Sequence, residues 1–205
     1  MTNQPARRTG GAATRDQIVE AALQTLATDG FAGASSRAIA RRGGFNQALI
    51  FYHFGSLDSL LLAALDRTSE RRLERYRAAV EEVESLEDLI AVASRAYAED
   101  RESGHMAVVS QMVAGSVARP ELAPAVLARM EPWIELAEEA LTKALAGTPA
   151  AERVPVRDLA YAIVTFYLGV NLLTHLDAKH VRADAVFAQL EALAPFMAAA
   201  TGAQL

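Results

Sequence analysis

Arginine side chains, which bind phosphate groups, gather at the start of this sequence. The first 56 residues hold six arginines against three acidic side chains, whereas the remainder holds 14 basic and 22 acidic residues. The net charge of −5 therefore combines a basic N-terminal part with an acidic remainder. Because phosphate attraction is local, this division is typical of a modular DNA-binding protein, although other proteins show it too. The six are Arg7, Arg8, Arg15, Arg37, Arg41 and Arg42.

Side chains that hold metals or act as nucleophiles show no catalytic spacing here. The four histidines, His53, His105, His175 and His180, lack metal-ligand spacing, and only Asp177 with His180 could share a metal. The absence of cysteine excludes disulfides and thiolate metal sites, and suits a reducing cytoplasm. There is no phosphate-cradling glycine loop, nucleophile elbow or nucleotide fingerprint. We therefore predict no enzymatic activity, no cofactor and no metal site.

The elements that must position the arginines are helical, because apolar residues recur at helical spacing and no segment alternates like a strand. Residues 1–13 lack an apolar run, so we expect a disordered basic arm there rather than a secretion signal. Three helices are expected next, over residues 14–30, 36–42 and 47–53. Ser35 and Asn46 can cap the second and third, and Gly43-Gly44 makes the turn between them. This arrangement predicts a helix-turn-helix.

The remaining helices form a larger, all-helical part from residue 56 to the end. A long helix follows Ser56; its apolar start must be buried, and its second half is charged apart from a narrow apolar seam. Ser85 and Asp88 resemble a capping box for a fifth helix, Leu86 to about Ser103. Further helices are expected over residues 105–117, from 120 or 124 to 146, 155–179 and 183–200.

The last two predicted helices present apolar residues in more than one direction, which one chain alone does not cover. A second copy would bury them in a four-helix interface, so we predict a homodimer through these helices. The stretch from Leu159 to Leu176 is 18 residues long without a formal charge. Polar interruptions favour a helix buried between protein surfaces over a membrane span, and we expect no membrane partner.

Residues 14–65 resemble the DNA-binding region of the TetR family of transcriptional regulators along its full extent. The shared motifs, in order, are Gly30-Phe31, Arg37-Ala38-Ile39-Ala40, Gly44-Phe45 and Phe51-Tyr52-His53-Phe54 followed by Gly55-Ser56. The resemblance implies about nine helices: a helix-turn-helix domain at 14–55 and a ligand-binding and dimerisation domain at 56–205. It also implies a cytoplasmic homodimer that binds a palindromic, double-stranded DNA operator, represses transcription there and is released by a small-molecule inducer.

The resemblance assigns the third helix to recognition of the major groove. Gln47 suits bidentate contact with adenine, and Phe51 or Tyr52 can pack on a thymine methyl or reach a phosphate. Arg37 matches a position that often contacts base or backbone, and Phe45 and Phe54 are expected in the core. The expected DNA-binding residues are Ser35, Ser36, Arg37, Arg41, Asn46, Gln47, Ala48, Leu49, Phe51, Tyr52 and His53.

The effector pocket is expected between the inner faces of the fifth to eighth helices. A lining of methionine and aromatic residues would favour an apolar or aromatic, weakly polar ligand. Asn171 and His175 lie one helical turn apart in a nearly uncharged helix, so their polar atoms need partners if buried. The expected ligand-binding residues are Tyr97, Met106, Gln111, Met112, Trp133, Phe166, Asn171 and His175.

Two positions depart from the family pattern, and they support a rival interpretation. Leu49 and Leu57 stand where the family often has Thr and Lys that touch phosphate, and each lost contact should shallow the salt dependence of DNA binding. A helical carrier protein that has lost DNA affinity is therefore one alternative. A metal-dependent or hydrolytic helical enzyme is the other.

Overall fold

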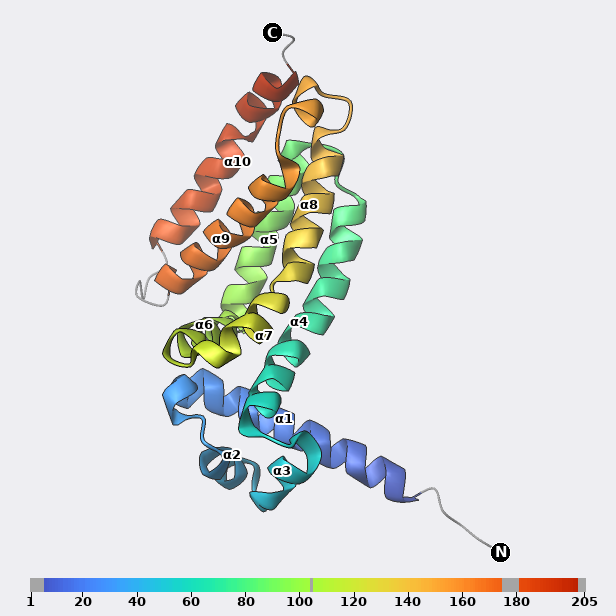
Figure 1. Cartoon of the computed structure of the whole chain (residues 1–205). Coiled ribbons are helices and arrows are strands. Elements are labelled where there is room, and N and C mark those ends of the chain that lie inside the picture. Colours follow the sequence, from blue (N-terminus) through green and yellow to red (C-terminus); the bar gives the residue numbers. More distant parts are fainter. Residues whose placement is uncertain (1–5, 104, 175–180, 203–205) are drawn as a thin grey trace, which may run out of the picture. The chain divides into compact units, whose positions relative to one another are not determined.

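The computed structural model describes residues 6–103, 105–174 and 181–202. The regular secondary structure in these ranges is helical, with no strand among them (Figure 1). This confirms the expected all-α fold. The chain divides into two compact units. The N-terminal unit is Met1–Ser69 with Ala107–Leu127, and the C-terminal unit is Glu70–Met106 with Ala128–Leu205. The boundary expected at residue 56 therefore lies inside the N-terminal unit.

The N-terminal unit contains α1 (Ala6–Gly33), α2 (Ser36–Gly43), α3 (Ala48–Phe54) and the start of α4 (Leu57–Glu81). Apolar residues at three- and four-residue steps bring one side of each helix into a shared core. The charged faces are left to the surface. Fully buried side chains of this core are Ile18, Leu26, Ile39, Ile50, Leu60, Leu61 and Leu65.

Helix α1 is longer than expected. It begins at Ala6 rather than at Thr14, so residues 6–13, expected in a disordered arm, are helical. Alanine and arginine favour helix, and extending a helix that is already nucleated costs little. The expected end at Asp29-Gly30 appears as an interruption, because Gly30 has φ 71° and ψ 178°, and one more helical turn follows to Gly33.

All of α6 (His105–Ala118) except its first two residues, the 3₁₀ turn η1 (Pro120–Leu122) and most of α7 (Ala123–Ala128) belong to the N-terminal unit. The Phe31 amide, exposed by the break at Gly30, donates to Gln111 Oε1 at 2.9 Å. Arg119 donates to Asp58 Oδ2 at 2.6 Å. These bonds join the end of α1 and the start of α4 to residues more than sixty positions away.

The C-terminal unit is a helical bundle. It holds α5 (Leu86–Ser103), α8 (Glu131–Leu145), the 3₁₀ turn η2 (Pro149–Glu152), α9 (Val156–Thr174) and α10 (Val181–Gly202). Helix α8 packs on α9, and α5 packs on both α8 and α10 (Figure 1). The α5 bounds match the prediction, and the Asp88 amide donates to Ser85 Oγ at 3.1 Å as a capping box requires.

The prediction of one long seventh helix up to residue 146 is wrong, because the structure divides this segment into η1, α7 and α8. A turn at Arg129-Met130 separates α7 from α8. Pro132 lies in the first turn of α8, where its missing N–H costs nothing, whereas within a continuous helix its ring would clash with the preceding turn.

Helices α9 and α10 are apolar yet largely exposed in the single chain. Both are long and apolar enough to cross a membrane, by length and composition alone. The described part of α9 buries only Ala160, Asn171 and Thr174. The burial on most sides that we expected for this segment is therefore not supplied by one chain. Exposed apolar side chains on the two helices include Leu159, Tyr161, Phe166, Leu172, Leu173, Val186, Leu193, Phe196 and Met197.

Candidate nucleic-acid interface

Helix α2 is fixed at both ends by local bonds. Ser35 Oγ accepts from the Ala38 amide at 3.2 Å, which confirms the expected N-cap. At the other end Gly44 adopts φ 69°, and its amide donates to the Ala40 carbonyl. A Cβ on Gly43 would lie 2.1 Å from the Phe45 ring, so only glycine fits at the turn. The turn between α2 and α3 is therefore set by its sequence.

Helix α3 presents one side to the core and the other to solvent. The N-cap of α3 is Gln47, which makes no side-chain cap bond, rather than the expected Asn46; Asn46 Oδ1 nevertheless accepts from the Ala48 amide at 2.8 Å, and Gly55 ends the helix at φ 75°. Ile50 is fully buried, whereas Phe51 is 47% exposed and Tyr52 81% exposed. The exposed side of α3 thus carries two aromatic side chains.

Gln47 links the two helices of the predicted helix-turn-helix. Its Nε2 donates to Ser36 Oγ at 2.7 Å, and both residues are half-buried. The bond holds the start of α3 against the start of α2. It also occupies the amide group that we expected to read adenine, so bidentate contact with a base would require Gln47 to give up this bond.

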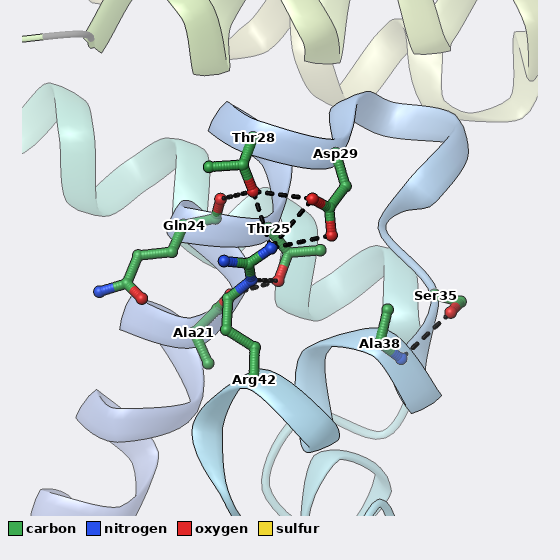
Figure 2. Close-up of polar contacts among 8 residues, drawn as sticks. All are labelled: Ala21, Gln24, Thr25, Thr28, Asp29, Ser35, Ala38 and Arg42. Atoms are coloured by element: carbon green, nitrogen blue, oxygen red, sulfur yellow. Dashed lines mark hydrogen bonds and ion pairs between the residues drawn. The ribbon is translucent and has the colours of Figure 1, made fainter.

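Arg42 holds α2 against α1 (Figure 2). Its Nε donates to Thr25 Oγ1 at 3.0 Å, and one Nη donates to Thr28 Oγ1 at 2.8 Å and to both Asp29 oxygens at 2.9 Å. The bond from Arg42, helped by Thr28, lowers the Asp29 pKa below its usual value. We expected this arginine to point outward with its neighbours; it is instead the main polar contact between the two helices.

The two other α2 arginines, Arg37 and Arg41, are exposed as expected. Arg15 lies over the Phe54 ring at 4.9 Å, a cation–π contact with a half-buried phenylalanine. His53 is half-buried and makes an edge-on contact with Tyr52, with ring centroids 5.0 Å apart. Phe45 is also half-buried.

The structure brings all eleven predicted DNA-binding residues together on α2, α3 and the turns that flank them, and none is buried. Their role in DNA binding stays a prediction. The exposed ones are Ser35, Arg37, Arg41, Asn46, Ala48, Phe51 and Tyr52, and the half-buried ones are Ser36, Gln47, Leu49 and His53.

The predicted ligand-binding residues do not form one group. Gln111 and Met112 belong to the N-terminal unit, where Gln111 accepts the bond from Phe31. Phe166 is 46% exposed on α9, and His175 lies outside the described residues. The others belong to the C-terminal unit, where Tyr97, Met106 and Asn171 are buried and Trp133 is half-buried. Asn171 Nδ2 donates to the Tyr167 carbonyl at 2.9 Å, within its own helix.

A buried polar cluster in the C-terminal unit was not expected from the sequence. Arg72 on α4 pairs with Asp100 on α5, with 7% and 2% of their side chains exposed. Tyr76 and Tyr167 donate their hydroxyls to Asp100 at 3.2 and 2.6 Å. Burial and the charge of Asp100 raise the pKa of Tyr76 to about 12 and also raise that of Tyr167. Both phenols therefore stay protonated. Only the four-residue step from Arg72 to Tyr76 hinted at this cluster.

Comparison with known proteins gives independent information on both units. The family described as "Bacterial regulatory proteins, tetR family" matches residues 18–64. The HTH-type transcriptional regulator UidR of Escherichia coli K12 is 26% identical over 114 residues, which cover 54% of this chain and 55% of UidR. The match thus spans about half the length of this curated relative.

Solved structures resemble the chain over most of its length. The multidrug binding protein EbrR, complexed with imidazole, is 26% identical with a TM-score of 0.59, over 86% of this chain and 93% of that one. FadR from Bacillus subtilis, in complex with stearoyl-CoA, is 18% identical with a TM-score of 0.71, over 86% and 95%. The second likeness concerns the fold alone.

Proposed function

Because the chain belongs to the TetR family of bacterial regulatory proteins, we propose that it is a dimeric repressor released from a palindromic operator by a small effector. The observation that carries the DNA-binding part is the 81% exposure of Tyr52 on α3. A helix held by fixed turns places this ring and hydroxyl where a major groove can receive them. The relatives are named as transcriptional regulators, which supports this function over enzymatic activity.

The exposed arginines and the aromatic side chains have different tasks in this proposal. Arg37 and Arg41 neutralise phosphates and position the helix, which contributes affinity without sequence information. Tyr52 and Phe51 contact the bases or the groove wall, which contributes selectivity. Leu49 and Leu57 are half-buried and supply no phosphate contact, so the salt dependence is shallower than in relatives that carry polar residues there.

Selection of bound fragments from the source genome, followed by mobility shifts, tests this part. We expect wild type to select a palindrome and Tyr52→Ala to lose about tenfold or more in affinity, corresponding to one good groove contact. Arg153→Ala is a control, because Arg153 is exposed in the C-terminal unit and lies outside α9 and α10. Failure of wild type to bind any fragment selectively at low salt would overturn the proposal in favour of a carrier protein.

The homodimer forms through α9 and α10. Two faces of α9 differ: Tyr167, Asn171 and Thr174 bond within the C-terminal unit, whereas Leu172 and Leu173 are 53% and 63% exposed. A second copy packed on the outer faces would bury these exposed apolar side chains. Burial against a second copy would also account for two helices that are long and apolar enough to cross a membrane.

Sedimentation of the full chain with and without detergent tests the dimer. We expect a dimer in plain buffer, and a monomer for Leu172→Glu, because the buried carboxylate would lack a partner. Arg153→Glu, an exposed change before α9, should leave the dimer intact. A wild-type protein that stays monomeric, or that requires detergent to remain in solution, would contradict this interface.

The effector acts by conformational selection. In the DNA-binding state the two recognition helices lie about one DNA turn apart, roughly 34–36 Å. Another conformation of the dimer holds the two helices at a different separation. An effector that binds this conformation more tightly removes the dimer from DNA, to an extent set by the ratio of its affinities for the two conformations. EbrR was crystallised with imidazole and FadR with stearoyl-CoA, which supports a small-molecule ligand for this chain. Titration of the operator complex with candidate effectors tests this step, and an operator complex that no effector alters would contradict it.

A further inference from the structure

The guanidinium of Arg72 lies in an unusually apolar setting for a charged group. Its carbon is 4.9 Å from the centre of the Trp133 ring and 5.8 Å from that of Tyr76. One Nη is 3.9 Å from the sulfur of Met106. Four elements of the C-terminal unit thus surround the group: α4, α5, the start of α6 and α8. A cation is stable there only because Asp100 pairs with it and the aromatic faces attract it.

The partner carboxylate already has several donors. Asp100 accepts from Arg72, from the Tyr76 hydroxyl at 3.2 Å and from the Tyr167 hydroxyl at 2.6 Å. Nearby His105 adds no charge at neutral pH, because burial and Arg72 lower its pKa. Among the side chains that the structure describes, the cluster therefore holds one cation and one anion.

Arg72 keeps one donor that nothing in the described part of the chain satisfies. Its Nε is buried and has no hydrogen-bond acceptor there. A buried donor of a charged group is costly to leave unpaired, and such groups in folded proteins are nearly always satisfied by protein, water or ligand. The cluster therefore lacks one hydrogen-bond acceptor, for Arg72 Nε. The Asp100 carboxylate, in contrast, already accepts bonds from three side chains.

We propose that the Nε–H of Arg72 binds the carbonyl oxygen of a neutral, mainly apolar effector, such as an ester, amide or ketone. This inference rests on the proposed function, because it names the chemical class that the C-terminal unit senses. One acceptor atom satisfies one N–H, and the surrounding Trp133, Tyr76 and Met106 favour an apolar body. A carboxylate would bring a second anion beside Asp100 in a setting of low polarity, where like charges repel strongly.

Fluorescence of Trp133 offers a direct test, since it is the only tryptophan and lies against the Arg72 guanidinium. The full chain is titrated at neutral pH with methyl hexanoate and with hexanoate, which differ in charge but share an apolar chain. We expect wild type to bind the ester about tenfold or more tightly than the carboxylate. The Asp100→Asn variant retains Arg72 but has an uncompensated positive charge, so its preference should shift toward hexanoate by a similar factor.

Two further variants separate the guanidinium from general packing. The pair Arg72→Gln with Asp100→Asn removes both charges together and should lose the preference for the ester. Arg75→Gln, which removes an arginine that is 63% exposed on the same helix, should behave as wild type. Circular dichroism checks that each variant is folded. If the double variant does not fold, the change of preference between ester and carboxylate in Asp100→Asn still tests the inference.

Several results would overturn the inference. Equal binding of ester and carboxylate by wild type would show that charge balance does not select the ligand. An unchanged preference in Asp100→Asn would show the same. No response of Trp133 to either probe would mean that an enclosed water satisfies the Arg72 donor. Because these titrations need no DNA, ester binding without any operator would refute only the regulator function, and operator binding without any ester response would refute only this inference.

Discussion

Replacing Arg42 by Met separates a structural arginine from one that binds DNA. Arg42 and Arg41 are neighbours on α2, and from the sequence both are expected to face solvent. In the structure Arg41 is exposed, whereas Arg42 bonds to Thr25, Thr28 and Asp29 on α1 (Figure 2). Arg42→Met keeps most of the aliphatic stem and removes every one of these bonds. It should therefore weaken the contact between α1 and α2 and leave the DNA-facing surface unchanged.

The expected loss of stability follows from the bonds to the two threonines. Each is worth about 0.5–1.5 kcal/mol, and both hydroxyls keep their own bonds to backbone carbonyls, so neither is left without a partner. The pair with Asp29 has side chains 31% and 39% exposed, and surface ion pairs add little. We expect the free energy of unfolding to fall by about 1–2 kcal/mol.

The pH dependence of this loss is also defined. The folded state lowers the Asp29 pKa, so the contribution of the ion pair is present above the pKa of Asp in the unfolded chain, about 3.9. It disappears as pH falls through the lower pKa of the folded state. The difference between wild type and Arg42→Met should therefore shrink in acid.

Urea unfolding and salt titration of operator binding together provide the assay. Arg42→Met should be less stable, with the same slope of log affinity against log salt as wild type. Arg41→Gln should be as stable as wild type within about 0.5 kcal/mol, with the slope reduced by about one unit per head. The opposite pattern, a stable Arg42→Met with a reduced slope, would refute our assignment of Arg42 to the contact between α1 and α2.

Two other changes test contacts between distant parts of the sequence. Gln111→Leu should lower the free energy of unfolding by about 1–3 kcal/mol because the Phe31 amide loses its acceptor, and Gln111→Glu, which keeps the acceptor oxygen, should restore most of it; equal melting of the two variants would contradict this. Tyr167→Phe should cost about 1–2 kcal/mol in urea unfolding because Asp100 loses a buried donor, whereas Arg75→Gln, at a position 63% exposed on α4, should change the free energy of unfolding by no more than about 0.5 kcal/mol. A Tyr167→Phe protein as stable as wild type would show that this hydroxyl is not needed in the cluster.

Local features of the fold were predictable because their causes lie within a few residues. The Ser35 cap, the turn at Gly43-Gly44 and the bounds of α5 all follow from bonds between near neighbours. The exposed side of α3 follows from helical periodicity in the same way. The broken seventh helix was missed although Pro132 was visible, because periodicity on both sides of a break looks continuous.

The sequence by itself determined that the chain is helical, where its helix-turn-helix lies and which side chains of α3 face solvent, since each depends on short-range geometry and periodicity. Only the tertiary structure decided that Arg42 bonds to α1, that Gln111 bonds to Phe31 in the N-terminal unit, and that Arg72, Asp100 and Tyr167 meet. The last three residues are separated by 28 and 67 positions. Whether charged groups so far apart in sequence become partners depends on how helices pack, and packing is decided by the apolar faces of all of them together.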